Sequence, residues 1–401
     1  NCNNTIFKNI IYATTHIFKE HDANVMVWTP PLPNGIAMCQ SGRVNHHLIE
    51  KEESAMNITT IGLDIAKNVF QIHGVDVNGK TVLRKQLKRK EVLAFFANLL
   101  PCLIGLEACG GAHYWARELI KLGHDARLIS PQFVKPYVKG NKNDSNDAEA
   151  ICEAVSRPNM RFVPIKSIEQ QDIQMLHRVR SGLVKERTAL ANRIRGLLAE
   201  YGLVIALGIV KLRQQLPEIL EDAENGLTVA ARKIFADLLE QLIELDKQVA
   251  AYGGRIEAIH RASAVSQLLA EIPGIGPLIA TALIAALGDG KAFKSARQVA
   301  AWLGLVPRQD SSGGKSRLLG ISKRGDVYLR TLLIHGARAV VNAAAKKDDA
   351  QSRWINDLVK RRNANIAAVA VANKNARTVW ALLTKSEHYE APVAASVRAN
   401  A

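Results

Sequence analysis

ITTIGLDIAKNVFQIHGVDVNGKTVLRKQL, residues 58–87, contains three apolar runs separated by polar residues. The runs cover residues 58–64, 69–77 and 81–87. Asn78-Gly79, between the second and third runs, is a strong signal for a two-residue hairpin turn. The stretch therefore predicts three consecutive strands that meander through one sheet.

The sequence after residue 87 alternates between helical and strand patterns. We predict these elements at residues 90–100 (helix), 102–107 (strand), 112–122 (helix), 125–129 (strand), near 132–138 (short helix) and about 145–156 (helix). Three meandering strands followed by α/β units is the element order of the ribonuclease H-like fold. Element order indicates a fold and does not by itself give a function.

Two further regions follow the predicted α/β domain. Residues 165–262 contain a single proline, Pro217, and two apolar stripes at helical spacing, which predicts a long helical middle. A coiled-coil spacer or dimer arm explains these stripes as well as a solvated linker does. The division we predict is 56–160 (α/β), 161–262 (helical linker), 263–385 (mostly α-helical domain) and 386–401 (tail).

The first 55 residues differ in character from the rest. They begin with Asn, mix Pro, Cys and His without a sustained period, and lack the basic character of a signal peptide. Met56 opens directly into the first predicted strand. We expect residues 1–55 to be a non-native or disordered extension with the natural start at Met56, although a genuine, weakly ordered extension is the alternative.

Composition limits the classes of function. The 401 residues carry a formal net charge of +16, which favours a polyanionic partner such as nucleic acid but also suits a purely solubilising surface. The five cysteines form no C-x-x-C pair, as expected in a reducing cytoplasm. No apolar run reaches the roughly 18 residues that span a membrane. The sequence predicts a cytoplasmic protein without a membrane partner.

Four carboxylates stand at positions suited to a metal site. Asp64 and Glu107 end two predicted strands, and Asp144 and Asp147 share one face at the start of a predicted helix. If that helix packs over the strand ends, the four converge into an oxygen-rich site suited to Mg²⁺ and phosphoryl transfer. Individually, Asp64 also fits a turn and Glu107 a loop before Gly110-Gly111. Asp144 or Asp147 also fits a helix cap.

A second group of residues lies in a basic, glycine-rich loop. Residues 291–340 contain ten Lys/Arg against two Asp, and Ser311 and Ser312 lie within that stretch. Ser312 is a candidate nucleophile for a phosphodiester, with cations stabilising the phosphate charge. Composition alone favours a passive loop that grips a nucleic-acid backbone. The candidate backbone contacts are Arg308, Lys315, Arg317, Lys323 and Arg324.

The segment Ile272-Pro273-Gly274-Ile275-Gly276-Pro277 precedes an apolar helix. A G-x-G turn between helices lets backbone N–H groups approach a phosphate, because no Cβ intervenes. We therefore assign Gly274 and Gly276 to a helix-hairpin-helix-like, nucleic-acid-binding element. A plain helix-capping turn is the alternative.

These motifs together resemble one family. Its signature motifs occur here in one order, as GLDIAK (62–67), EACGG (107–111), KNDSNDA (142–148), PGIGP (273–277), SGG (312–314) and ISKRG (321–325). The chain is identified by them as similar to the transposases of the insertion sequence 110 family, in the 1111-type branch. The resemblance covers about residues 57–385.

The resemblance implies a RuvC-like domain whose D-E-D-D metal site matches Asp64, Glu107, Asp144 and Asp147. It also implies a C-terminal transposase domain with a catalytic serine matching Ser312, next to Ser311. In the family, donor and target DNA are recombined through a covalent phosphoserine intermediate. A structured guide RNA directs the reaction, and a dimer of dimers joins one subunit's carboxylates to another's serine.

Two other functions fit the residues. A metal-dependent DNA junction nuclease would use the carboxylates without serine chemistry. A non-enzymatic nucleic-acid-binding protein would use neither. Aromatic residues make up only 5% of the chain, which argues against a dominant base-stacking platform.

Overall fold

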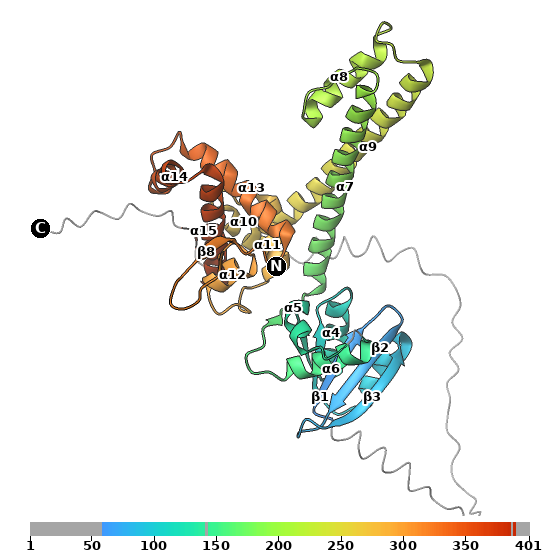
Figure 1. Ribbon diagram of the computed structural model, residues 1–401, viewed down its shortest axis with the longest axis vertical. Helices are drawn as coiled ribbons and strands as arrows, with labels where there is room; N and C mark the ends of the chain where they lie inside the picture. The colour runs from blue at the N-terminus through green and yellow to red at the C-terminus, as the bar shows by residue number, and fades with distance from the viewer. Residues whose placement is uncertain (1–57, 141–142, 386–387, 390–401) are drawn as a thin grey trace, which may run out of the picture. The chain divides into compact units, whose positions relative to one another are not determined.

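The computed structural model describes residues 58–140, 143–385 and 388–389. These residues form a mixed α/β region that is followed by a mostly helical region (Figure 1). The predicted extension at residues 1–55 and most of the predicted tail lie outside the described residues.

A six-stranded sheet forms the centre of the α/β region. Its strands are β1 (Thr60–Ile65), β2 (Val69–Val75), β3 (Thr81–Lys88), β4 (Leu103–Glu107), β5 (Asp125–Ile129) and β6 (Phe162–Val163). They lie in the order β3-β2-β1-β4-β5-β6. Strands β1, β4 and β5 run parallel, and β2, β3 and β6 each pair antiparallel with a neighbour.

The strand predictions agree closely with the sheet, and β5 has the predicted bounds. The predicted helix at 90–100 is a short 3₁₀ turn, Arg89–Glu91, followed by α3 (Val92–Ala97). The two-residue strand β6 was not predicted, because two residues cannot display a period.

Helices cover both faces of the sheet. Helices α3 and α4 (Ala112–Lys121) place Phe96, Trp115 and Leu119 in one hydrophobic cluster with Ile61 and Leu63 of β1. Successive strand residues point to opposite faces. Gly62, between these two, therefore belongs to the other face, where α6 (Asp144–Val155) packs. The short helix α5 (Pro131–Val134) precedes α6.

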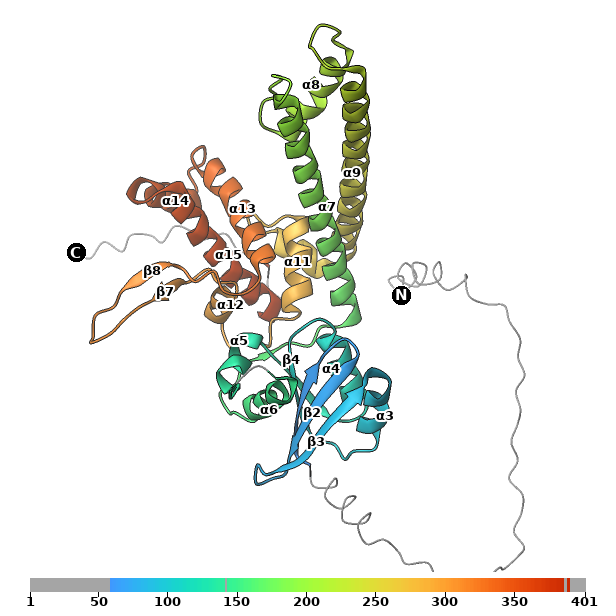
Figure 2. The ribbon, with the colours of Figure 1, turned by 45° about the vertical axis from the view of Figure 1, so that its right-hand side comes forward.

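Three helices make up the middle of the chain. The long helices α7 (Ile168–Ala199) and α9 (Val229–Ala262) pack side by side, and α8 (Ile209–Glu221) lies between them in sequence (Figure 2). Asp246 of α9 accepts hydrogen bonds from Arg187 of α7 at 2.9 Å and from Arg213 of α8 at 2.8 Å. Of the predicted apolar stripe on α7, Leu190 and Ile194 are buried, whereas Val179 and Leu197 are exposed.

The C-terminal helices share a separate hydrophobic cluster. They are α10 (Ala264–Ala270), α11 (Pro277–Leu287), α12 (Ala296–Trp302), α13 (Val327–Ala344), α14 (Ala350–Arg361) and α15 (Ala364–Lys385). Between α12 and α13 the chain forms a two-stranded hairpin of β7 (Pro307–Gln309) and β8 (Leu318–Ile321). Within the described residues, no helix is long and apolar enough to cross a membrane.

His177 joins α7 to two of these helices. Its ring Nδ1 lies 2.9 Å from the Tyr328 hydroxyl of α13, and Nε2 lies 3.0 Å from Oγ1 of Thr281 in α11. The Thr281 hydroxyl donates to the Pro277 carbonyl at 2.8 Å, so it accepts from Nε2–H. The ring is 2% exposed, and its burial, with Arg180 nearby, lowers the pKa of His177 from 6.5 to about 4.

This shift predicts loss of stability in mild acid. As pH falls below 6.5 the unfolded chain protonates His177 first, so the folded state loses stability between pH 6.5 and about 4. Between pH 7 and 5 the wild type should lose about 2 kcal/mol more than His177→Gln. Denaturant unfolding at both pH values measures the difference. Equal losses in the two chains would show that His177 does not couple protons to folding.

Candidate metal-carboxylate site and serine hairpin

The sequence repeats a tetrad on two neighbouring strands. Ile61-Gly62-Leu63-Asp64 lies on β1 and Ile104-Gly105-Leu106-Glu107 lies on β4. The strands are parallel, with Gly62 opposite Gly105 and Leu63 opposite Leu106. Asp64 and Glu107 each follow the last of these pairs by one residue. They therefore lie side by side at the C-terminal ends of the neighbouring strands β1 and β4. Both are strand residues, which excludes the turn and loop interpretations.

The paired glycines allow α6 to lie directly against the sheet. A Cβ on Gly62 would collide with the Ala148 carbonyl oxygen and would lie 2.5 Å from the Cys152 amide nitrogen. A Cβ on Gly105 would lie 2.8 Å from Cβ of Val155. Only a residue without a side chain permits this approach of helix backbone to strand backbone. The glycines thus determine how close α6 lies to the strands bearing Asp64 and Glu107.

The first turn of α6 carries the other two carboxylates. Asn143 is the N-cap residue, and its side chain accepts a hydrogen bond from the Ser145 amide at 3.1 Å. Asp144 and Asp147 are therefore not the caps that the alternative interpretation allowed. As acids in a first turn they also interact favourably with the helix dipole.

Three of the carboxylates act electrostatically on the fourth, Asp64. The pKa of Asp64 is raised from 3.8 to about 6, first by burial and then by the negative charges of Asp147, Asp144 and Glu107. Burial, Glu107 and Asp64 also raise the pKa of the Cys109 thiol. The sequence-predicted acids therefore share one region of negative potential, and Cys109, which was not predicted, borders it.

The donor set fits a hard divalent cation. Carboxylate oxygens are the ligands that Mg²⁺ prefers, and a cation would offset the repulsion that raises the pKa of Asp64. However, no three Asp, Glu, His or Cys side chains among the described residues are close enough together to form a ready ligand set. The arrangement is thus a concentration of negative charge rather than a preformed metal cage.

Gly62→Ala is expected to displace α6 and destabilise the chain by about 3 kcal/mol or more, because the added methyl group meets backbone atoms that cannot rotate away. The midpoint of denaturant unfolding measures the change. Gly196→Ala is the matched control. Gly196 lies exposed in α7 with open space around its Cα, so alanine should stabilise the helix by up to about 1 kcal/mol. A Gly62→Ala chain as stable as wild type would refute the close packing of α6.

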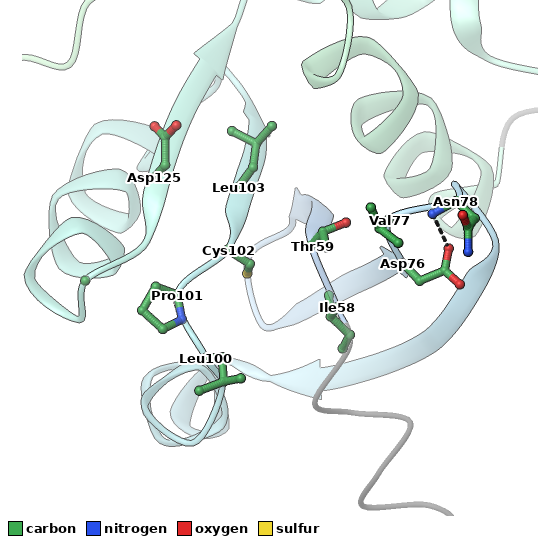
Figure 3. Close-up of a pocket in the computed structure, with 11 residues that line it drawn as sticks. Ile58, Thr59, Asp76, Val77, Asn78, Leu100, Pro101, Cys102, Leu103 and Asp125 are labelled. Carbon is green, nitrogen blue, oxygen red and sulfur yellow. Dashed lines mark hydrogen bonds between the residues drawn. The ribbon is translucent and has the colours of Figure 1, made fainter.

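A hollow of about 680 Å³ among the described residues lies elsewhere (Figure 3). Its lining includes Ile58 and Thr59 before β1, Cys102 before β4, and Asp125 at the start of β5. Parallel strands begin at this edge, whereas the carboxylates stand where β1 and β4 end. The hollow is therefore at the opposite end of the strands from the carboxylates and takes no part in the candidate site.

Ser312 lies at the tip of the β7–β8 hairpin, where the sequence had indicated only a loop. The Lys315 amide donates to the Ser312 carbonyl at 3.0 Å, and these two residues form a β-bridge. Gly313 and Gly314 between them have φ of 54° and 76°. Two successive positive φ values suit a tight hairpin turn of the I′ type, which glycine adopts without steric cost.

The two adjacent serines differ in their contacts. Ser311 Oγ accepts hydrogen bonds from the Gln309 side chain at 3.0 Å and from the Arg317 amide at 3.2 Å. Ser312 is exposed, and among the described residues its hydroxyl has no hydrogen-bond partner. Ser311 therefore contributes to holding the hairpin together, while the Ser312 hydroxyl faces solvent.

The predicted nucleic-acid contacts fall into two groups. Five exposed cations lie on the hairpin or just after it: Arg308, Lys315, Arg317, Lys323 and Arg324. In the turn between α10 and α11, a Cβ on Gly274 would lie 2.8 Å from the Gly336 carbonyl oxygen of α13. Gly274 thus serves an internal packing contact. Gly276 caps α11 and has open space beside it, so a phosphate contact there remains a prediction.

Sequence reasoning missed three further residues near these sites. Gly62 and Gly105 would have been found by comparing the two I-G-L-acid tetrads. Arg330 of α13 is 7% exposed and hydrogen-bonds to both ends of the hairpin segment. No pattern in the sequence distinguishes Arg330 from the other arginines of that helical stretch.

Comparisons with known proteins identify the family. Residues 266–353 match the model described as "Transposase IS116/IS110/IS902 family", and residues 61–203 match a DEDD transposase model of the IS110 type. The DEDD domain implies a ribonuclease H-like fold, in agreement with the predicted element order.

Relatives that align over nearly their whole length carry transposase names. A "Probable family 20 transposase" of Pseudomonas aeruginosa is 55% identical, over 83% of this chain and 99% of the relative. The "Transposase for insertion sequence element IS1111A" of Coxiella burnetii is 47% identical, over 90% of this chain and 98% of the relative. A "Pilin gene-inverting protein" of Moraxella bovis is 28% identical, over 69% of this chain and 81% of the relative. The chain therefore belongs to the IS116/IS110/IS902 family of transposases, enzymes that cut and rejoin DNA.

Proposed function

We propose that this transposase recombines DNA through a covalent phosphoserine formed at Ser312, with Mg²⁺ held by Asp64, Glu107, Asp144 and Asp147. The observation that carries the proposal is the contrast between the two adjacent serines. Ser311 Oγ is engaged within the hairpin, and the Ser312 hydroxyl is exposed among cations. Arginine and lysine nearby stabilise charge that develops on a phosphate under attack.

In the proposed step, Ser312 Oγ attacks the phosphorus of a DNA strand. An Oγ–P bond forms, the P–O bond to one sugar breaks, the serine proton is released, and the departing sugar oxygen becomes a hydroxyl. Because one phosphodiester bond replaces another, a hydroxyl of a new strand can reverse the step and release the serine. The relative named for inverting a pilin gene supports a reaction of this cut-and-rejoin type.

The carboxylates would bind the metal as the oxygen ligands Mg²⁺ prefers. When bound, the ion supplies Lewis-acid stabilisation of charge on a phosphate. The side chains contribute their negative charge and their placement by β1, β4 and α6. Metal binding would require the four carboxylate side chains to move closer to one another than they lie in the described structure. Titration of Mn²⁺, followed by its spin-resonance signal, tests for the site without depending on activity.

The family resemblance supports the remaining parts of the proposal. It implies a RuvC-like α/β domain, a structured guide RNA, and a dimer of dimers. The G-x-G turn at Gly274 and Gly276 adds a helix-hairpin-helix-like element to the proposal. The long packed pair of α7 and α9 suits a coiled-coil arm of such an assembly. Base pairing by an RNA would supply sequence choice, so the protein's net charge of +16 would serve to hold backbones.

The test uses the full chain with the element's flanking RNA, Mg²⁺ and labelled donor and target DNA. A denaturing gel should show a protein–DNA adduct, and mass spectrometry of its peptides should locate the linkage at Ser312. Cleaved DNA without an adduct would favour a metal-dependent junction nuclease instead. Bound but covalently unchanged DNA would favour a non-enzymatic binding protein.

A further inference from the structure

The β7–β8 hairpin has no hydrophobic core of its own. Residues 307–318 are exposed throughout, and Figure 2 shows the two strands extending away from α12, α13 and α15. An isolated two-stranded hairpin is marginally stable in water, so its direction depends on how its base is attached. The position of Ser312 at the tip is therefore determined at the base.

One buried arginine joins the two ends of the hairpin segment. Nη1 of Arg330 donates to the Leu303 carbonyl at 3.1 Å and to the Arg324 carbonyl at 2.9 Å. Leu303 precedes β7, and Arg324 follows β8. The same nitrogen therefore bridges the chain entering the hairpin and the chain leaving it, and α13 holds both.

The backbone at the base is packed tightly around this bridge. A Cβ on Gly304 would lie 2.6 Å from the Arg324 amide nitrogen, and a Cβ on Gly325 would collide with the Trp302 carbonyl oxygen. Lys323, between the strands and this contact, has a φ of 54°, a conformation unfavourable for a residue with a side chain. The Lys323 amide donates to the Gly304 carbonyl at 3.1 Å. Such a conformation persists only where its surroundings hold it.

Among the described residues, the Arg330 guanidinium hydrogen-bonds only to these two carbonyl groups. Within the part of the chain that the structure describes, no carboxylate lies within ion-pair distance of its guanidinium. A buried cation bonded only to carbonyls is costly, since it has given up water without gaining an opposite charge. Arg338 on the same helix shows the ordinary arrangement, exposed and bonded to the Asn365 side chain at 3.3 Å.

We propose that Arg330 is a positioning residue for the transposition reaction, fixing the direction of the β7–β8 hairpin and so presenting Ser312 to the phosphodiester. The proposal rests on the proposed role of Ser312. It does not require Arg330 to touch DNA, because its bonds are to Leu303 and Arg324. A nucleophile displaced by about 1 Å loses on the order of 100-fold in rate. Loss of the bridge should thus reduce the rate of the chemical step more than the affinity for DNA.

The experiment compares Arg330→Met and Arg330→Lys with the control Arg338→Met in the full chain. Hydrogen exchange is measured at the amides of Ser322 and Lys323, which bond across the base to Val306 and Gly304. Arg330→Met should speed exchange there about 10-fold or more, while the amides of α11 and α15 keep their wild-type protection. Arg330→Lys, which keeps a donor of the same charge, should restore much of the protection. Arg338→Met should match the wild type.

The same variants are then compared in adduct formation. Arg330→Met should lower the single-turnover rate constant about 100-fold with the DNA dissociation constant changed less than about 3-fold. Wild-type exchange at the hairpin base in Arg330→Met would overturn the proposal, as would a wild-type rate constant. If Arg330→Met does not fold, Arg330→Lys decides, because slower chemistry at unchanged DNA affinity is expected there too.

A failure of the proposed Ser312 chemistry would be distinguishable from a failure of the proposed anchoring by Arg330. Exchange needs neither DNA nor the serine, so it reports on the anchoring by itself. A wild-type chain that cuts DNA without forming an adduct would overturn the role of Ser312, and with it the positioning of a nucleophile by Arg330.

Discussion

Ser312→Ala is expected to reduce recombination by about 10⁵-fold or more and to abolish the protein–DNA adduct. The substitution removes a hydroxyl at the hairpin tip that has no partner among the described residues, and it removes no charge. Binding of RNA and DNA should therefore stay close to that of the wild type. The rate of adduct formation on a denaturing gel and a filter-binding titration measure the two quantities.

Ser311→Ala is the matched control, one residue away. It removes the acceptor of the Gln309 and Arg317 hydrogen bonds, so it should loosen the hairpin and slow the reaction while the adduct still forms. An adduct that persists in Ser312→Ala and disappears in Ser311→Ala would assign the nucleophile to Ser311. Loss of RNA binding in Ser312→Ala would point to a structural role for the tip.

Asp64→Asn should have opposite effects on activity and stability. Its carboxylate is the member of the four whose pKa is raised to about 6, so at pH 7 the folded chain holds an unfavourable negative charge. Asparagine removes this charge and one metal-binding oxygen. Recombination should fall about 1,000-fold or more, because the proposed metal site loses a central ligand.

The stability of Asp64→Asn should rise. The pKa shift corresponds to at most about 3 kcal/mol. Because the side chain is partly exposed and screened by solvent, a gain of about 1 kcal/mol is expected. Thermal unfolding without metal at pH 7 measures it, with Asp125→Asn as the control. Asp125 starts β5 and pairs with Arg127, so its loss should leave recombination unchanged. An Asp64→Asn chain that is less stable than wild type would contradict mutual repulsion among the carboxylates.

Both substitutions act on sites that the sequence predicted without showing how they are built. The i, i+3 spacing places Asp144 and Asp147 on one face of a helix, but it does not say what that face meets. The structure supplies the answer through Gly62 and Gly105, where α6 lies against the strands that carry Asp64 and Glu107. The role of these glycines depends on two strands becoming neighbours, which local periodicity does not encode.

The sequence by itself determined the order of the α/β elements, the strand ends that carry Asp64 and Glu107, and the family. Apolar periodicity and turn residues are local signals, and they survive without knowledge of the partner elements. Only the tertiary structure decided that Ser312 lies at the tip of a hairpin and that the Ser311 hydroxyl accepts hydrogen bonds within that hairpin. It also decided that Arg330 joins the hairpin's two ends. These are contacts between residues distant in sequence or paired across a turn, and their energies depend on packing and burial that exist only once the chain has folded.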